Sequence, residues 1–160
     1  MIEKKALVFL GKFFAIFIAL YYALVSLDST FLQQWLAESM ANALRLPLEG
    51  NMLWVGNSAF QINESCTGLV SAILLTSTVF SVRKPAFRKK AAIWVVGLIV
   101  LFLANLVRLY AVLWAGIQWG VGAAEAFHVI SWFLMSALIL ALWYCGVRYA
   151  EGKQAFGELL

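Results

Sequence analysis

The feature that most constrains this chain is a series of long apolar runs separated by short clusters of Lys and Arg. Four such runs occupy residues 6–27, 67–82, 91–114 and 126–147. A transmembrane helix needs about 20 largely apolar residues to cross about 30 Å of hydrocarbon. The sequence therefore predicts an all-α integral membrane protein with about four transmembrane helices.

The overall composition excludes a water-soluble domain. Of the 160 residues, 64% are hydrophobic and only 12% are charged, whereas a soluble domain carries roughly 25% charged residues. So few polar side chains cannot cover a water-facing surface, and the length suits one bundle surrounded by membrane lipids. We expect a single membrane domain over residues 1–160. Its net charge of +4 does not indicate nucleic-acid binding, because the basic residues cluster beside the apolar runs.

The distribution of basic residues predicts the orientation. Ten of the twelve Lys and Arg residues flank the same side of the predicted spans. They are Lys4, Lys5, Lys12, Arg83, Lys84, Arg88, Lys89, Lys90, Arg148 and Lys153. Basic residues are enriched in cytoplasmic segments. We therefore expect a multi-pass protein of the plasma membrane with both termini and the 83–90 loop in the cytoplasm, and with the 28–65 segment outside.

The outer 28–65 segment is the one long connection between predicted spans. Apolar residues over Thr30–Leu44 recur at helical spacing, which is typical of an amphipathic helix lying at the membrane interface. Pro47 ends this pattern. Residues 48–62 then predict a small hairpin, with its turn at Gly56-Asn57.

Three chemically active side chains remain unexplained by topology, and each belongs to a different predicted helix. Cys66 opens the 67–82 span from outside, and His128 lies in the first turn of the 126–147 span. Arg108 lies 17 residues beyond residue 91, which is about 25 Å along a helix. All three are thus expected at one depth near the outer face. Ionisable groups at such positions are costly and mark candidate functional sites.

These residue types suit acyl transfer. A cysteine at a helix N-terminus beside a cation gains thiolate character. Histidine can act first as a general base and then as the acid for a leaving amine. Arg108 can stabilise an oxyanion, while Asn105, three residues earlier on the same helix face, can orient it. Glu64 lies two residues before Cys66 and can position His128 or Arg108.

Several alternatives remain open. Taken singly, each of the three residues has an ordinary explanation. Cys66 can be a buried thiol, His128 an interfacial imidazole and Arg108 a side chain that snorkels to the membrane surface. A non-catalytic assembly or transport subunit would tolerate their substitution. A zinc site from Cys66, His128 and Glu64 is disfavoured because Arg108 would oppose a cation, so we expect no metal and no cofactor. Acyl transfer from a lipid would use the same three residues.

Three motifs, taken in order, resemble the exosortase/archaeosortase family of membrane transpeptidases. They are Glu64-Ser65-Cys66-Thr67-Gly68, then Asn105-Leu106-Val107-Arg108, then His128. That family carries Cys-x-Gly at the start of one span, Asn-x-x-Arg in the next and His at the start of the following one. The similarity covers residues 50–143, and Cys-Thr-Gly stands here where the family more often has Cys-Ser-Gly.

The resemblance implies a sortase-like cysteine transpeptidase whose active site is extracytoplasmic. Its substrates would be secreted proteins ending in a short motif, a hydrophobic helix and a basic tail. Cys66 would form a thioacyl enzyme, His128 would shuttle the proton and Arg108 would stabilise the oxyanion. A lipid or glycan-linked acceptor would resolve the intermediate.

Overall fold

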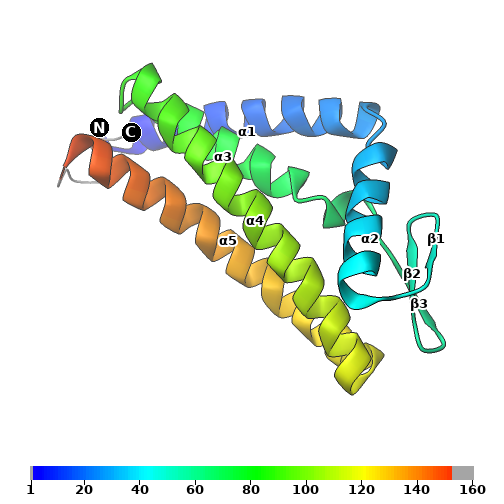
Figure 1. Ribbon diagram of the computed structural model, residues 1–160. Helices are drawn as coiled ribbons and strands as arrows, with labels where there is room; N and C mark the ends of the chain where they lie inside the picture. Colours follow the sequence, from blue (N-terminus) through cyan, green and yellow to red (C-terminus); the bar gives the residue numbers. More distant parts are fainter. Residues whose placement is uncertain (1, 153–160) are drawn as a thin grey trace.

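The computed structural model describes residues 2–152, which form a helical bundle with one small sheet at its side (Figure 1). Lys153, one of the flanking basic residues, lies outside the described residues. In chain order the elements are α1 (Ile2–Ser26), α2 (Thr30–Leu44), β1 (Leu48–Glu49), β2 (Met52–Val55), β3 (Ser58–Gln61), the 3₁₀ helix η1 (Glu64–Cys66), α3 (Leu69–Ser81), α4 (Phe87–Trp119) and α5 (Val121–Glu151). The predicted all-α membrane fold is confirmed.

The predicted number of about four transmembrane helices is not matched exactly. Among the described residues, three helices (α1, α4 and α5) are long and apolar enough to cross a membrane. The run at 67–82 instead forms α3, whose 13 residues extend about 20 Å. Gly68 precedes it with φ of 80°, a left-handed conformation that ends helical hydrogen bonding on its N-terminal side. α3 therefore packs as a short inner helix against α1, α4 and α5.

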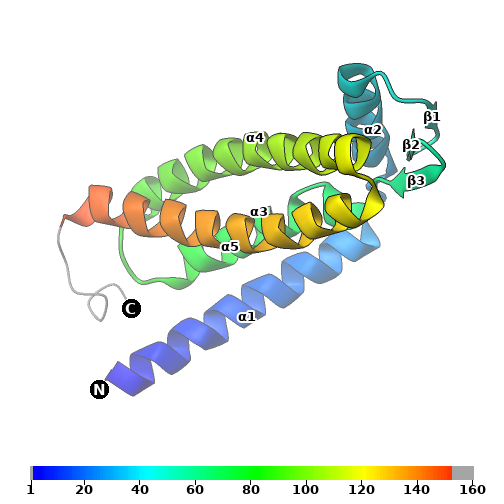
Figure 2. The ribbon, with the colours of Figure 1, turned by 90° about the horizontal axis from the view of Figure 1, so that it is seen from below.

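α4 and α5 are longer than the apolar runs that predicted them. They contain 33 and 31 residues, or about 50 and 47 Å, because helical hydrogen bonding continues beyond the hydrocarbon-length stretch at both ends. α4 begins at Phe87, so the predicted 83–90 loop is shorter than expected. The two helices run antiparallel side by side and turn at Gly120, as Figure 2 shows.

The outer segment has the helix and hairpin that its sequence pattern predicts. α2 covers Thr30–Leu44, and hydrogen bonds from the Thr30 hydroxyl and its backbone N–H lower the pKa of the exposed Asp28 carboxyl just before it. β2 and β3 form an antiparallel hairpin, and the two-residue β1 adds a strand on the far side of β2. The buried face of α2 packs with Leu53 of the sheet and Leu109 of α4.

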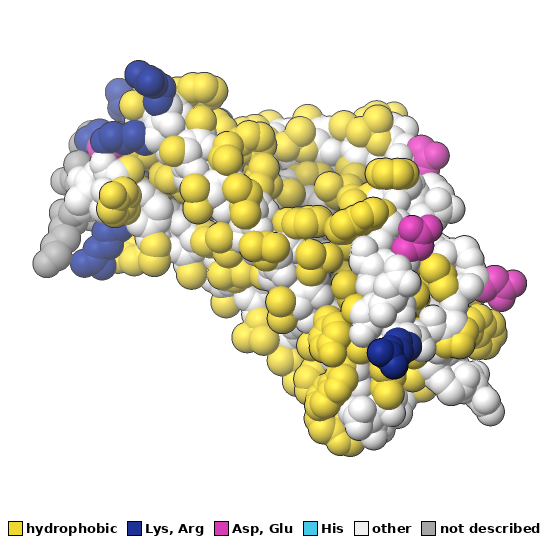
Figure 3. Space-filling view, viewed as in Figure 1, with side chains coloured by type: hydrophobic (Ala, Val, Ile, Leu, Met, Phe, Trp, Pro, Cys, Tyr) yellow, Lys and Arg dark blue, Asp and Glu magenta, His cyan; other side chains and the backbone are white. Residues whose placement is uncertain are grey.

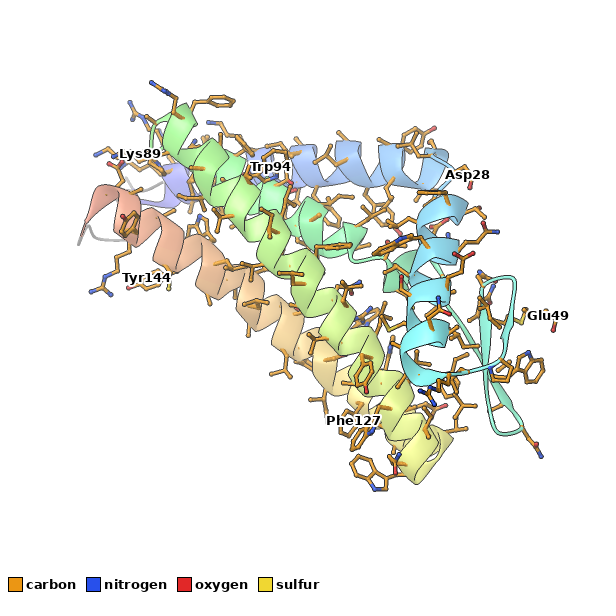
Figure 4. The ribbon with its side chains drawn as sticks, in the orientation of Figure 1. Asp28, Glu49, Lys89, Trp94, Phe127 and Tyr144 are labelled. Carbon is orange, nitrogen blue, oxygen red and sulfur yellow. The ribbon has the colours of Figure 1, made fainter. Side chains whose placement is uncertain are left out.

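Charged side chains divide between the two ends of the bundle. On the face drawn in Figure 3, Lys and Arg gather at the end formed by the start of α4 and the end of α5, and acidic side chains gather at the other end. Figure 4 shows Lys89 and Tyr144 at the first end, and Asp28 and Glu49 at the second. Lys89 forms a salt bridge of 3.0 Å to Glu151. The basic end is thus the one that sequence analysis predicts to be cytoplasmic.

Candidate active site

Cys66 lies on a turn that local hydrogen bonds hold in place. The Asn63 side chain accepts a hydrogen bond from the Ser65 backbone N–H at 3.1 Å, and the Thr67 hydroxyl donates to the Glu64 carbonyl at 2.6 Å. Cys66 is the last residue of η1 and is 8% exposed, and two residues separate it from the start of α3. The thiol therefore stands just before the N-terminus of α3, at the end of a short 3₁₀ helix that the sequence pattern did not predict.

Gly68 allows this turn to pack against α4. A Cβ added at Gly68 would lie 3.0 Å from Asn105 Cγ, and the φ of 80° is one that L side chains rarely adopt. Asn105 Nδ2 donates to the Cys66 carbonyl at 2.9 Å. The glycine two residues after the cysteine thus lets the asparagine of the second motif reach the cysteine of the first.

Asn105 also accepts a hydrogen bond from Arg108. This contact is the one that their spacing of three residues on one helix predicts. Arg108 Nε donates to Asn105 Oδ1 at 3.1 Å, and Arg108 Nη2 donates to the Ser65 carbonyl at 3.4 Å. Asn105 is 1% exposed and Arg108 is 8% exposed. The guanidinium is therefore fixed behind the cysteine turn and not turned outward to solvent.

His128 approaches from α5. The helix begins at Val121, so His128 lies two turns inside it and not in its first turn, contrary to prediction. The imidazole is half-buried and its ring centroid is 5.6 Å from that of Trp132. This contact with the next turn of α5 fixes the side on which the imidazole lies.

Two adjoining cavities connect these residues. Cys66 and His128 line the larger cavity, of about 620 Å³, whereas Arg108, Asn105 and Gly68 line the smaller one, of about 180 Å³. Ser65 and Trp132 line both. Arg108 also lies close enough to Cys66 and to His128 to interact with each electrostatically. The structure thus brings thiol and imidazole into one cavity, while the guanidinium lines the adjoining cavity and donates to the carbonyl of Ser65, the residue before the thiol.

Glu64 is not part of this arrangement. Its side chain is exposed and lines neither cavity, and its backbone carbonyl is the group that contacts Thr67. Over residues 2–152 no group of three His, Cys, Asp or Glu residues is placed to hold a metal ion. The zinc alternative built on Cys66, His128 and Glu64 therefore lacks a donor set in this part of the chain.

Two residues that sequence reasoning missed line the larger cavity. Glu125 and Trp132 lie there with His128. They precede and follow His128 by three and four residues, the spacing that places side chains on one helix face. Counting along the helix from His128 would have found both.

The helical membrane fold and the cavity that joins a thiol to an imidazole define a multi-pass membrane protein with a candidate cysteine site. The family comparison is more specific. The chain matches the transmembrane exosortase family over residues 4–145 and belongs to that family. No curated protein and no solved structure matches it.

Proposed function

We propose that the protein is a membrane cysteine transpeptidase that cleaves C-terminal sorting signals of secreted proteins and transfers them to an acceptor. The observation that carries this proposal is the shared cavity of Cys66 and His128, with Arg108 fixed beside it. A thiol nucleophile, a group that moves protons and a fixed cation are what acyl transfer through a thioester requires. Membership of the exosortase family supports the same chemistry.

In the first half-reaction the Cys66 thiol gives its proton to His128 and attacks the carbonyl carbon of the scissile peptide bond. The carbonyl electron pair moves onto oxygen, and Arg108 stabilises the resulting oxyanion. Nε and Nη2 of Arg108 are engaged by Asn105 and Ser65, which leaves N–H donors of Nη1 for the substrate. Collapse of the tetrahedral intermediate breaks the C–N bond, and the leaving amine takes the proton from His128.

In the second half-reaction an acceptor amine attacks the thioester. His128 removes a proton from the incoming amine and returns one to the Cys66 sulfur as the C–S bond breaks. The acceptor is a lipid or a glycan-linked carrier. Glu125 lines the same cavity, and its carboxylate can take the extra proton of an acceptor that arrives as an ammonium ion, which leaves the neutral amine that attacks.

The substrate's orientation follows from the charge of the bundle. We infer that the basic end and both termini are cytoplasmic and that the cavities face the extracytoplasmic side of the plasma membrane. A substrate with a hydrophobic helix and a basic tail would then cross in the same direction, its tail beside Lys89 and its neighbours. From Arg108 the smaller cavity continues between α3 and α5 along Leu74, Met135 and Ile139, an apolar path suited to the start of that hydrophobic helix.

The test is processing of a tagged secreted protein that carries such a C-terminal signal, co-expressed with the full chain. Cys66→Ala should abolish processing and the thioester adduct seen by mass spectrometry. Cys145→Ala is the matched control, because Cys145 is exposed and lines a groove at the basic end of the bundle. Processing that survives Cys66→Ala would contradict the proposal and favour a non-catalytic assembly or transport subunit.

A further inference from the structure

β3 is an edge strand with free backbone hydrogen-bonding groups. The sheet order is β1-β2-β3, so β3 pairs on one side only. Just beyond β3, the Ile62 N–H donates to the Asn51 carbonyl at 2.9 Å. Because antiparallel pairing alternates along a strand, Ser58 and Phe60 also face β2. Ala59 and Gln61 therefore direct their N–H and C=O groups away from the sheet.

The larger cavity runs along this free edge. Six consecutive residues, 58–63, line it, whereas the face of a strand would contribute only every second residue. The rest of the lining comes from α4 and from α5, which contributes Val121, Glu125 and His128 among others. Cys66 also lines the cavity. A volume of about 620 Å³ lies within the range of roughly 300–1,000 Å³ that is usual for ligand pockets.

The two edges of the sheet differ in how open they are to a further strand. At the other edge, β1 has only two residues, Leu48 and Glu49, and follows Pro47. Shortness, charge and proline are the features by which proteins block strand addition. β3 is twice as long and contains no charged residue and no proline over Ser58–Gln61.

We propose that the larger cavity binds an extended peptide that adds to β3 as a further strand and delivers its C-terminal end to Cys66. Resting on the proposed function, this peptide is the short motif that precedes the hydrophobic helix of the substrate. The substrate chain continues from Cys66 towards the membrane, so the added strand runs parallel to β3. Main-chain pairing supplies affinity in this mode of recognition, and pockets for alternate side chains supply specificity.

The test measures how fast Cys66 reacts with a peptide disulfide, so it does not depend on acyl transfer. The protein is the full chain in detergent with Cys145→Ala, which leaves Cys66 as its one thiol. The probe is a short acetylated peptide of alternating threonine and valine that ends in a cysteine carried as its 2-pyridyl disulfide. The Cys66 thiolate attacks the peptide's sulfur, a mixed disulfide forms and 2-thiopyridone leaves, which absorbance records.

A set of probes, each N-methylated at one backbone position, reads out strand pairing. Methylation at every second position should lower the second-order rate constant by about 3- to 10-fold, the value of one hydrogen bond. Methylation at the intervening positions should change it by less than about 2-fold, because those N–H groups point away from β3. Equal effects at all positions, or none at any, would overturn the proposal.

A variant tests the protein side of the same contact. Ala59→Pro removes an outward N–H without removing a bond to β2, and should slow the unmethylated probe by a similar factor of about 3 to 10. A small pyridyl disulfide without a peptide should react at an unchanged rate, which shows that the thiol is intact. An unchanged peptide rate in Ala59→Pro would count against the added strand. If the small reagent also slows, the variant has disturbed the fold, and the methylation series on the unaltered β3 decides alone.

The two proposals can fail separately. If methylation shows the alternating pattern but Cys66→Ala still processes the substrate, the peptide-binding proposal stands and the proposed enzymatic function is contradicted. If Cys66→Ala abolishes processing but methylation shows no alternating pattern, the proposed enzymatic function stands and the added strand is contradicted.

Discussion

Two parts of the bundle bury polar side chains to the same degree but use them differently. Ser77 on α3 is 0% exposed and Asn105 on α4 is 1% exposed. The Ser77 hydroxyl donates to the Ile73 carbonyl of its own helix at 2.8 Å. Asn105 instead contacts the backbone of Cys66 and the side chain of Arg108, and so ties η1 to α4. Burial of a polar group therefore does not by itself mark a site. What sets Asn105 apart is that its hydrogen bonds join the turn that carries Cys66 to Arg108.

Three further hydroxyls of α3 follow the pattern of Ser77, whereas the Ser71 side chain lines the smaller cavity. Thr76, Thr78 and Ser81 each donate to the carbonyl four residues earlier. In an apolar surrounding this carbonyl is the nearest acceptor, so the hydroxyl is satisfied without a partner helix. Thr76 alone also accepts a hydrogen bond from another helix, from Trp94 Nε1 at 2.9 Å. The α3 hydroxyls thus give little support to a polar transport path through the bundle.

Variants can test this contrast between Asn105 and the α3 hydroxyls. The largest loss of processing is expected from Arg108→Lys. Lysine keeps the charge but lacks the planar fork that contacts Asn105 and Ser65 together. Loss of one oxyanion donor costs on the order of 10²–10³ in rate, so processing of the tagged substrate should fall by about that factor. Arg148→Lys is the matched control, since Arg148 is exposed at the basic end and, within residues 2–152, its side chain donates to Tyr144 of the same helix. Equal rates in the two variants would show that only charge matters at residue 108.

A smaller effect is expected from Asn105→Ala. It leaves the Cys66 carbonyl and Arg108 Nε without their partner, and each unsatisfied buried group costs about 1–3 kcal/mol. The apparent unfolding temperature in detergent should therefore fall, and processing should slow because the guanidinium loses its support. A variant as stable as the parent chain would mean that water replaces the amide and that Asn105 does not hold the two motifs together.

Gly68→Ala should lower the unfolding temperature and the processing rate by less than Asn105→Ala does. The left-handed conformation costs an L residue about 1–2 kcal/mol, and the new Cβ would press on Asn105 at 3.0 Å from its Cγ. We expect a modest drop in unfolding temperature together with slower processing. Gly11→Ala in α1 is the control, because a Cβ there meets nothing within 4 Å, and it should be neutral or slightly stabilising. Equal losses in both variants would argue against the contact between Gly68 and Asn105.

The parts of the fold that sequence predicts are those with local, periodic causes. Apolar runs predict α1, α4 and α5, and helical spacing predicts α2 with its bounds. The contact between Asn105 and Arg108 follows from a separation of three residues on one helix. The predicted supporting role of Glu64 rests on proximity in sequence to Cys66, and its exposed side chain lines neither cavity.

The features that sequence did not predict depend on contacts between distant segments. The need for a glycine at residue 68 depends in part on the close approach of Asn105, 37 residues later. The depth of His128 within α5 depends on where that helix begins, and Val121 lies outside the apolar run that predicted the span.

The smallest effect, and the one that tests the contrast most directly, is expected from Ser77→Ala. The Ile73 carbonyl already accepts the helical N–H of Ser77, so removing the hydroxyl leaves no backbone group without a partner. The free energy of unfolding should change by less than about 1 kcal/mol, and processing should stay within about 2-fold of the parent rate. Asn105→Ala, measured in parallel by thermal unfolding in detergent, should lie clearly below it. If Ser77→Ala proved as damaging as Asn105→Ala, burial itself would be the cause in both, and hydrogen bonds between elements could no longer be used to locate the site.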